Sequence, residues 1–343
     1  MEYRTLGASG CAVSAYALGT MTFGKETEEE EAHAQLDRYV DAGGTLIDTA
    51  DVYSAGRAEE IVGRWWRKVA PAVRDRMVLA TKGRFPTTDG PNGAGLSRRH
   101  LSEALDASLA RLQTDVIDLY QAHAWDPLTP IEETLRFYDD AVRAGKIRYA
   151  GFSNFTGWQV QKAVDTADRV GVARPVSLQP QYNLLVREVE WEIIPACQST
   201  GLGVLPWSPL GGGWLTGKYR REERPSGATR LGENPDRGVE AYDRRRRVER
   251  TWEVIDCVER IATARGVSMS QVALAWLAAR PAVASVILGA RTLPQLEDNL
   301  GAASLRLDAD ETAALDRASD PAAADYPYGG PGVEQRSRVI NQR

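Results

Sequence analysis

Three apolar stretches of this chain end in residues that could carry out acid–base chemistry. The stretch LIDTADVYS holds Asp48 and Tyr53, MVLATKG ends next to Lys82, and VIDLYQAHA leads to His123. A lysine ammonium favours the phenolate form of a neighbouring tyrosine, so we expect Lys82 to lower the pKa of the Tyr53 phenol from its usual value of ~10. Asp48 is expected to keep a partly buried Lys82 charged, while a neutral His123 could hydrogen-bond a substrate oxygen. The four groups together predict a site that protonates a carbonyl oxygen.

Each of these residues, taken alone, has an ordinary structural interpretation. Asp48 could form a turn, Tyr53 could pack at a rim, Lys82 could be a surface amine, and His123 could be a buried, hydrogen-bonded imidazole. The catalytic interpretation requires elements that bring all four to one place. The carboxyl ends of the strands of an α/β barrel surround its catalytic face, so side chains at equivalent strand ends converge there.

Eight candidate strands are spaced as such a barrel requires. A barrel of ~250 residues gives roughly 31 residues per strand–helix unit, and the first seven strand starts lie at intervals near that value. Helical patterns separate the strands, which favours one parallel α/β domain over two domains. The predicted strands begin near Ala15, Leu46, Val78, Val116, Tyr149, Val176, Gly203 and Ala284. The expected fold is therefore an α/β protein, a (β/α)8 TIM barrel, with residues 1–343 as a single domain.

Further segments are expected to decorate this barrel. YRTLGASGCAVS is typical of a β-hairpin that caps the barrel bottom, and DADETAALDRASD predicts an extra helix near the C-terminus. A long loop is expected at about 211–243, and the tail at about 321–343 is either a frayed end or a flap over the barrel mouth. Ser97 is expected to begin a helix, and Gly171 and Gly201 to end others.

The composition excludes several classes of function. With 43% hydrophobic and 26% charged residues, the chain is typical of a soluble globular protein. A net charge of −5 gives no general attraction for nucleic acid or acidic membranes, and the arginine run DRRRRVER is interpreted as a solvated helix face. No apolar run reaches the ~18 residues of a membrane helix, and the N-terminus does not resemble a signal peptide. Cys11, Cys197 and Cys257 are expected to be reduced thiols, so we expect a cytoplasmic protein.

The sequence resembles the aldo-keto reductase superfamily over nearly its whole length. GGTLIDTADVYSAGRAEEIVG is similar to the family's Asp and Tyr signature, ATKG to its Lys strand and DLYQAH to its His strand. The resemblance implies that Asp48, Tyr53, Lys82 and His123 form the family's catalytic tetrad. It also implies an enzyme, an NADP-dependent reductase or alcohol dehydrogenase, related to aryl-alcohol dehydrogenase-like members.

A hydride donor is needed as well, and the chain lacks the G-x-G-x-x-G of a Rossmann fold after its first strand. The resemblance implies instead that NADP(H) lies across the barrel mouth. Trp207 is expected to stack on the nicotinamide, where many relatives have Tyr, and Lys218 to bind the pyrophosphate. Arg291 offers a bidentate partner for a 2′-phosphate, which favours NADPH over NADH.

The cofactor contacts implied by the resemblance come from several strand ends. They are Gly19, Thr20, Met21, Asp48, Ser153, Asn154, Gln179, Trp207, Ser208, Pro209, Leu210, Gly212, Lys218, Gly289, Arg291, Gln295, Asp298 and Asn299. No metal site is expected.

The substrate pocket is expected to be lined by Met21, Tyr53, Phe85, His123 and Trp125. Their apolar and aromatic character predicts a hydrophobic aldehyde or ketone, or the corresponding alcohol in the reverse direction. We expect hydride to reach the carbonyl carbon while Tyr53 protonates the oxygen. The oligomeric state is left open.

Two other functions are compatible with the residues. The resemblance extends to potassium-channel β subunits, so the protein could be a nucleotide-sensing regulatory subunit with little turnover. A barrel hydrolase could use Asp48 and Asp51, but no metal-ligand cluster accompanies them, and His33, His100 and His123 are the only histidines.

Overall fold

The computed structural model describes residues 1–227, 229–236, 238–323 and 325–336. Eight strands form one parallel sheet in the order β10-β3-β4-β5-β6-β7-β8-β9. Their bounds are β3 (Tyr16–Gly19), β4 (Leu46–Asp48), β5 (Val78–Gly83), β6 (Ile117–Ala122), β7 (Ile147–Ser153), β8 (Ser177–Gln179), β9 (Gly203–Val204) and β10 (Val286–Leu288). Every predicted strand is present, and each begins within two residues of its expected start.

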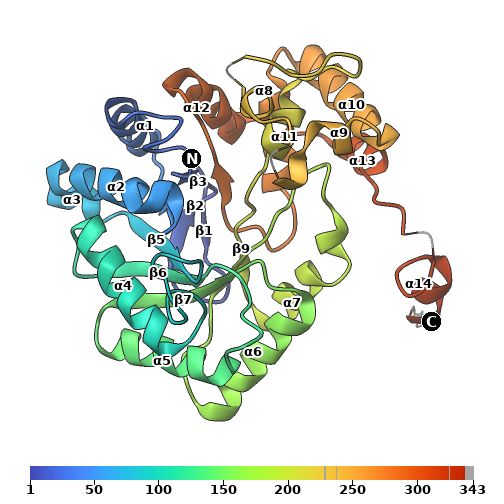
Figure 1. The fold of residues 1–343 in the computed structure, drawn as a ribbon. Helices are drawn as coiled ribbons and strands as arrows, with labels where there is room; N and C mark the ends of the chain where they lie inside the picture. Colours follow the sequence, from blue (N-terminus) through green and yellow to red (C-terminus); the bar gives the residue numbers. More distant parts are fainter. Residues whose placement is uncertain (228, 237, 324, 337–343) are drawn as a thin grey trace.

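The sheet closes into a barrel between its two end strands. The Ala284 amide donates to the Val204 carbonyl at 2.9 Å, and the Ile287 amide donates to the Pro206 carbonyl at 3.0 Å. Figure 1 shows the helices arranged around this sheet. The predicted (β/α)8 TIM barrel is confirmed.

The helices that cover the barrel follow the strands in alternation. They are α1 (Glu29–Asp41), α2 (Arg57–Lys68), α3 (Pro71–Arg74), α4 (Arg98–Leu112), α5 (Ile131–Arg143), α6 (Gly157–Val170), α7 (Ile193–Thr200), α10 (Glu249–Arg265), α11 (Met269–Ala278) and α12 (Leu293–Leu300). Ser97 caps α4 by accepting a hydrogen bond from the His100 amide. Gly171 and Gly201 end α6 and α7 in the left-handed conformation, as expected.

The N-terminal hairpin, β1 (Tyr3–Thr5) with β2 (Ala12–Ser14), caps the end of the barrel where the strands begin. Leu6 and Val13 are fully buried and belong to the same apolar cluster as Leu46 inside the barrel. Gly7 has a φ of +61°, and a Cβ there would lie 2.5 Å from the carbonyl oxygen of Gly201. Glycine is therefore required at this close approach.

The long loop after β9 contains several short helices. These are η3 (Gly211–Thr216), α8 (Arg230–Glu233), η4 (Gly238–Glu240) and α9 (Tyr242–Arg245). The arginine run at 243–250 was interpreted as a solvated face of one helix. It instead spans the end of α9 and the start of α10, and Val248 between them is 41% exposed.

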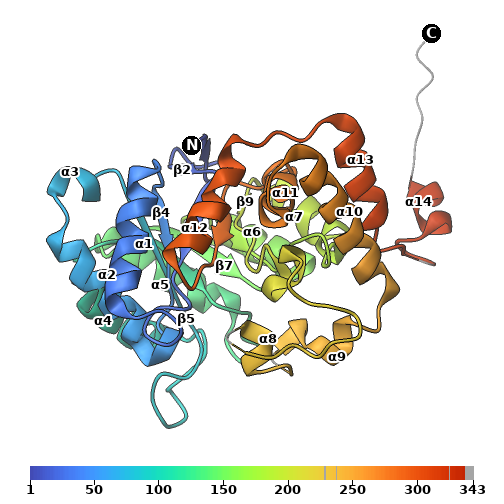
Figure 2. The ribbon, with the colours of Figure 1, turned by 90° about the horizontal axis from the view of Figure 1, so that it is seen from above.

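The C-terminal part contains the expected extra helix, α13 (Ala309–Ala318), and then α14 (Gly330–Arg336). In Figures 1 and 2, α14 lies outside the ring of barrel helices. The ring of Tyr328 stacks on Trp191 at 5.2 Å, with an interplanar angle of 16°. The predicted tail at about 321–343 lies partly outside the described residues, and its described part does not form a flap over the tetrad.

Candidate active site

The four predicted catalytic residues come together at the carboxyl ends of three neighbouring strands. Asp48 ends β4, Lys82 lies near the end of β5, and His123 follows β6. Tyr53 opens η1 (Tyr53–Gly56), the single turn that joins β4 to α2. The parallel register places Asp48 beside Ala80 and Gly83 beside Ala122, so the four side chains share one end of the barrel.

Lys82 is the centre of this group. Its Nζ donates to Asp48 Oδ2 at 2.7 Å, to the Thr49 carbonyl at 2.7 Å and to the Tyr53 hydroxyl at 3.2 Å. The side chain is 0% exposed. Burial lowers the pKa of the Lys82 amine, but the Asp48 carboxylate and the Tyr53 hydroxyl outweigh burial, and the pKa is raised. The ammonium form is therefore stabilised, as expected.

Asp48 is held in place by two amides. Gln179 Nε2 donates to Asp48 Oδ1 at 2.9 Å, and Gln121 Nε2 donates to the same oxygen at 3.2 Å. Gln179 was predicted as a cofactor residue, whereas Gln121 was not predicted to have a role. Its position two residues before His123 on an alternating strand was the available signal. The two amides orient the carboxylate toward Lys82.

The expectation that Lys82 produces a net decrease in the pKa of Tyr53 is wrong for this structure. Burial raises the pKa of the half-buried phenol, the nearby Lys82 ammonium lowers it, and Asp48 raises it again. The result lies above the ordinary value for tyrosine. Tyr53 is therefore a protonated hydrogen-bond donor at neutral pH, which suits a proton donor.

His123 is a neutral imidazole. Burial, the Lys82 ammonium and the Arg84 guanidinium lower its pKa to about 2. Its ring lies 5.9 Å from the Tyr53 ring and 4.7 Å from the Phe85 ring, between centroids. Nδ1 is buried and has no hydrogen-bond partner among the described residues. Tyr53, His123 and Phe85, three predicted pocket residues, therefore lie together.

Three of the predicted cofactor residues, Ser153, Asn154 and Gln179, form one connected network, and the resemblance implies that they hold the carboxamide of the nicotinamide. Ser153 Oγ donates to the Gln179 carbonyl at 2.9 Å, and Asn154 Nδ2 donates to the His123 carbonyl at 2.9 Å. Trp207 Nε1 donates to Asn154 Oδ1 at 3.0 Å, and the two residues follow β9 and β7. The network links the tetrad to the indole that was expected to stack on a nicotinamide.

The glycines of η3 let the chain pass closely over Lys218. Gly212 and Gly213 have φ angles of 64° and 98°, and a Cβ at Gly213 would lie 2.4 Å from Lys218 Cε. Burial lowers the pKa of the Lys218 amine, and the nearby Arg291 and Arg230 lower it further. Lys218 is an exposed residue, and three cations gathered near one another at a surface are typical of an anion-binding site.

Arg291 already has acidic partners in this structure. Its guanidinium forms hydrogen bonds of 2.8 and 2.7 Å to Glu233 of α8 and an ion pair of 3.3 Å with Glu26. Its backbone amide donates to Gln295 Oε1 at 3.0 Å. Neither glutamate was predicted to contribute. Their positions, in the turn before α1 and in the long loop, carry no local signal of this pairing.

The remaining predicted cofactor residues occupy varied surroundings. The Thr20 amide donates to the Asp48 carbonyl at 3.0 Å, whereas Met21 is 37% exposed. Asn299 Nδ2 donates to the Gly289 carbonyl at 3.3 Å. The Asp298 carboxylate accepts hydrogen bonds from Ser268 and Gln271, so it joins α12 to α11. Gly19, Ser208, Pro209 and Leu210 lie in the segments that directly contain or follow β3 and β9.

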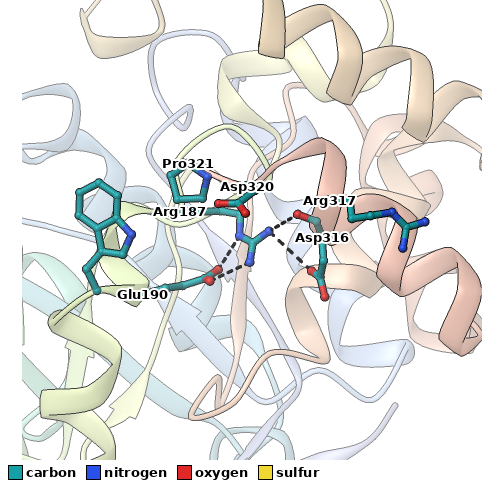
Figure 3. Close-up of a pocket in the computed structure, with 7 residues that line it drawn as sticks. Arg187, Glu190, Asp316, Arg317, Asp320 and Pro321 are labelled. Atoms are coloured by element: carbon teal, nitrogen blue, oxygen red, sulfur yellow. Dashed lines mark hydrogen bonds and ion pairs between the residues drawn. The ribbon is translucent and has the colours of Figure 1, made fainter. Parts of the chain in front are cut away.

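A separate hollow lies away from this site. It has a volume of about 310 Å3 and lies between η2 (Glu188–Glu190) and the end of α13 (Figure 3). Arg187 binds Glu190 there at 2.7 and 2.8 Å and also binds Ser319 at 2.9 Å. These polar groups satisfy one another, so we assign the hollow a structural role.

The described part of the chain contains no group of three or more His, Cys, Asp or Glu residues arranged to hold a metal ion. None of its helices has the length and apolar character needed to cross a membrane.

The chain matches known proteins over most of its length. The model of the Aldo/keto reductase family matches residues 16–320. The chain is 39% identical to "Uncharacterized oxidoreductase YrpG" of Bacillus subtilis, over 90% of this chain and 93% of that protein. It is 36% identical to "Versiconal hemiacetal acetate reductase" of Aspergillus parasiticus, over 94% of this chain and 98% of that protein. It is 39% identical to "Probable voltage-gated potassium channel subunit beta" of Oryza sativa subsp. japonica, over 88% and 91%. The family match and these identities show that the chain belongs to the aldo/keto reductase family.

Proposed function

We propose that the protein is an NADP(H)-dependent oxidoreductase that reduces the carbonyl of an aldehyde or ketone and can oxidise the corresponding alcohol. Membership of the aldo/keto reductase family supports an oxidoreductase activity. The observation that carries the proposal is the Lys82 ammonium, 2.7 Å from Asp48 and 3.2 Å from the Tyr53 hydroxyl, beside a neutral His123. NADPH would supply the hydride when bound.

The residues of this chain have separate tasks in that reaction. His123 holds the substrate oxygen by a hydrogen bond, and the Tyr53 hydroxyl donates its proton to that oxygen. Lys82 stabilises the phenolate that remains, because the ammonium lies within hydrogen-bond distance of the phenol oxygen. Asp48 keeps Lys82 charged. In alcohol oxidation the same phenolate accepts the proton.

The residues near Lys218 fit the phosphates of a dinucleotide. Arg291 and Arg230 depress the pKa of the Lys218 amine, and an anion bound among the three would relieve this repulsion. The half-buried indole of Trp207 and the network of Asn154 and Ser153 would hold the nicotinamide. We further propose a cytoplasmic protein that binds small molecules, and neither nucleic acid nor membrane is proposed as a partner.

The test is oxidation of NADPH, followed by its absorbance, with a panel of aldehydes, ketones, quinones and keto-sugars. We expect turnover with at least one class, and a loss of about 10²-fold or more in kcat for Tyr53→Phe. NADPH affinity should change little in this variant, because the hydroxyl is placed to meet the substrate. Full activity of Tyr53→Phe would show that another group donates the proton.

A regulatory role is the second candidate, because the chain is 39% identical to a probable channel β subunit. That role predicts tight NADPH binding without turnover on any member of the panel. Binding of NADPH, measured by quenching of tryptophan fluorescence, therefore separates the two functions when it is compared with turnover.

A further inference from the structure

Arg84 lies beside the tetrad and forms no ion pair within 4.0 Å among the described residues. It lies directly after β5 and is half-buried. Its Nη2 donates to the Trp125 carbonyl at 3.4 Å, and its Nε is buried without a hydrogen-bond partner among the described residues. By contrast, Arg111 in the last turn of α4 binds Glu59 at 2.7 Å. A partly buried guanidinium with unused donors is costly unless an anion binds it.

The neighbouring carboxylates are already engaged. Asp126 accepts hydrogen bonds from the Leu96 amide at 2.8 Å, the Leu128 amide at 2.9 Å and the Thr129 hydroxyl at 2.6 Å. Asp48 is bound by Lys82 and two amides. The ion pairs found within 4.0 Å in the described part of the chain include none with Arg84. Arg84 acts on Asp126 only at longer range, where it helps to lower the pKa of that carboxyl, so its N–H donors remain available to an anion from outside the chain.

Arg84 also faces the place where a substrate would bind. Its Cζ lies 4.9 Å from the centroid of Phe85, whose ring contacts the His123 ring at 4.7 Å. The guanidinium acts on the imidazole, since it contributes to the low pKa of His123. A molecule whose oxygen is bound by His123 therefore has Arg84 within reach, and Phe85 and Trp125 beside its remaining atoms.

The phosphates of a dinucleotide do not account for this cation. Lys218 follows β9 and Arg291 follows β10. In the closed order of eight strands, β5 is four strands from β9 and three from β10. Arg84 thus lies on the opposite side of the mouth from the other cations.

We propose that Arg84 binds a carboxylate of the substrate, so that the enzyme prefers aromatic aldehydes and ketones that carry a carboxylate. The aromatic ring packs against Phe85 and Trp125 while the guanidinium binds the carboxylate through parallel N–H donors. This inference rests on the proposed function, because it names the substrate class of the same site. Arg84 then contacts the substrate, without taking part in proton transfer.

The first test compares charged and neutral substrates of one shape. The probes are 3- and 4-carboxybenzaldehyde and their methyl esters, and kcat/KM is measured for each with NADPH and with NADH. We expect the wild-type protein to prefer at least one acid over its ester by about tenfold or more. Arg84→Gln should reduce this preference by about tenfold, and Arg84→Lys should reduce it less.

A matched control removes a charge from the same rim. Lys162 is exposed and lies 5.9 Å from the ring of Trp158 on α6. Lys162→Gln should leave the acid-to-ester preference unchanged, because only general attraction is lost. An equal fall in the acid-to-ester preference of Lys162→Gln and Arg84→Gln would overturn the proposal. Equal kcat/KM values of the wild-type protein for the esters and the acids would overturn it too.

A binding measurement separates this inference from the proposed function. Terephthalate and its dimethyl ester are titrated calorimetrically into the wild-type protein and the two Arg84 variants, with and without NADPH. The carboxylate site is supported if the wild-type protein binds terephthalate more tightly than its dimethyl ester and Arg84→Gln binds terephthalate about tenfold more weakly. This support holds even if no aldehyde is reduced. Turnover of the esters with unchanged terephthalate binding in Arg84→Gln would overturn the inference and leave the proposed function standing. A thermal melt of each variant verifies folding, and Arg84→Lys provides the comparison if Arg84→Gln does not fold.

Discussion

At the scale of single residues, the tetrad depends on where one positive charge is placed. Lys82 has three acceptors for its three protons, so its ammonium is fully hydrogen-bonded in a buried place. Removing Asp48 would leave this ammonium without its carboxylate, which is far more costly than losing one surface ion pair. The pKa of Lys82 is raised for this reason, whereas that of His123 is lowered. The site therefore combines a charged amine with a neutral imidazole.

A second buried carboxyl, Asp51, gives a prediction about stability. Burial and the Glu59 carboxylate raise its pKa to about 7, while Arg111 and Lys82 oppose them. The folded pKa is above the unfolded one, so the stabilisation is complete below the unfolded pKa and is lost as pH rises through about 7. Asp51→Asn cannot ionise. We therefore expect its melting temperature, relative to wild type, to rise between pH 5 and pH 8.

The measurement is thermal unfolding of both proteins at several pH values. A relative gain of about 2 °C or more at pH 8 would match a buried charge of this kind. Asp41→Asn is the control, because Asp41 is an exposed carboxylate at the end of α1. A relative melting temperature of Asp51→Asn that stays constant, or falls with rising pH, would show that Asp51 keeps its charge without cost.

At the scale of elements, the long loop is fastened to the barrel by two glutamates. Glu240 of η4 accepts hydrogen bonds from Gln181 and from Ser208 and pairs with Arg245 at 3.6 Å. Glu233 of α8 binds Arg291. The loop thus runs from β9 toward β10 and contacts Arg291, one of the cations proposed to hold phosphates. Its position and the availability of Arg291 are therefore coupled.

This coupling sharpens the prediction for Arg291. Arg291→Ala is expected to weaken the binding of NADPH by about tenfold more than the binding of NADH, because a bidentate partner of the 2′-phosphate is lost. Glu233→Gln breaks the same ion pair but keeps the guanidinium. We expect this variant to retain or increase its preference for NADPH. Dissociation constants for both nucleotides, measured by fluorescence titration, decide the matter.

Equal losses of affinity for NADPH and NADH in Arg291→Ala would contradict recognition of the 2′-phosphate by Arg291. If Arg291→Ala and Glu233→Gln lost the same NADPH affinity, the ion pair would only hold α8 in place.

Local patterns were sufficient to predict much of the fold and the places of the four tetrad residues. The eight strands, the cap at Ser97 and the strand-end positions of Lys82 and His123 depend on residues close together in the sequence. The break between α9 and α10 was missed, because helical periodicity continues across the arginine run while Val248 faces solvent.

Features that depend on distant contacts could not be predicted from local patterns. The pKa of Tyr53 follows from how deeply tertiary packing buries it, and burial outweighs Lys82. The pairing of Arg291 with Glu26 and Glu233 joins three separate segments. Arg84 was overlooked because an arginine after a strand is ordinary, and only its lack of an acidic partner makes it notable.

At the scale of the whole molecule, one network joins the barrel to its C-terminal helices. Arg187 binds Glu190 and the Asp316 carbonyl, the latter at 2.9 Å (Figure 3). It also binds Ser319, and its Cζ lies 5.3 Å from the Trp276 ring. Trp276 Nε1 also donates to Asp316 at 2.9 Å. The segment after β8 is thereby tied to α11 and α13. The chain up to Ser319 is consequently part of the barrel's packing.

The residues after Asp320 are expected to be dispensable for catalysis. The contacts of this tail include the stack of Tyr328 on Trp191 and its hydrogen bond to Glu192, two residues that directly precede α7. A chain that ends at Asp320 keeps the Arg187 network and the bond from Arg250 to the Asp320 carbonyl. We expect its kcat and KM to stay within about threefold of wild type, because surface contacts away from a site contribute little. Trp191→Ala in the full chain removes only the stack with Tyr328, and its kcat and KM should also stay within about threefold of wild type. A large rise in KM on truncation, with an unchanged melting temperature and an unaffected Trp191→Ala, would show that the tail reaches the substrate after all.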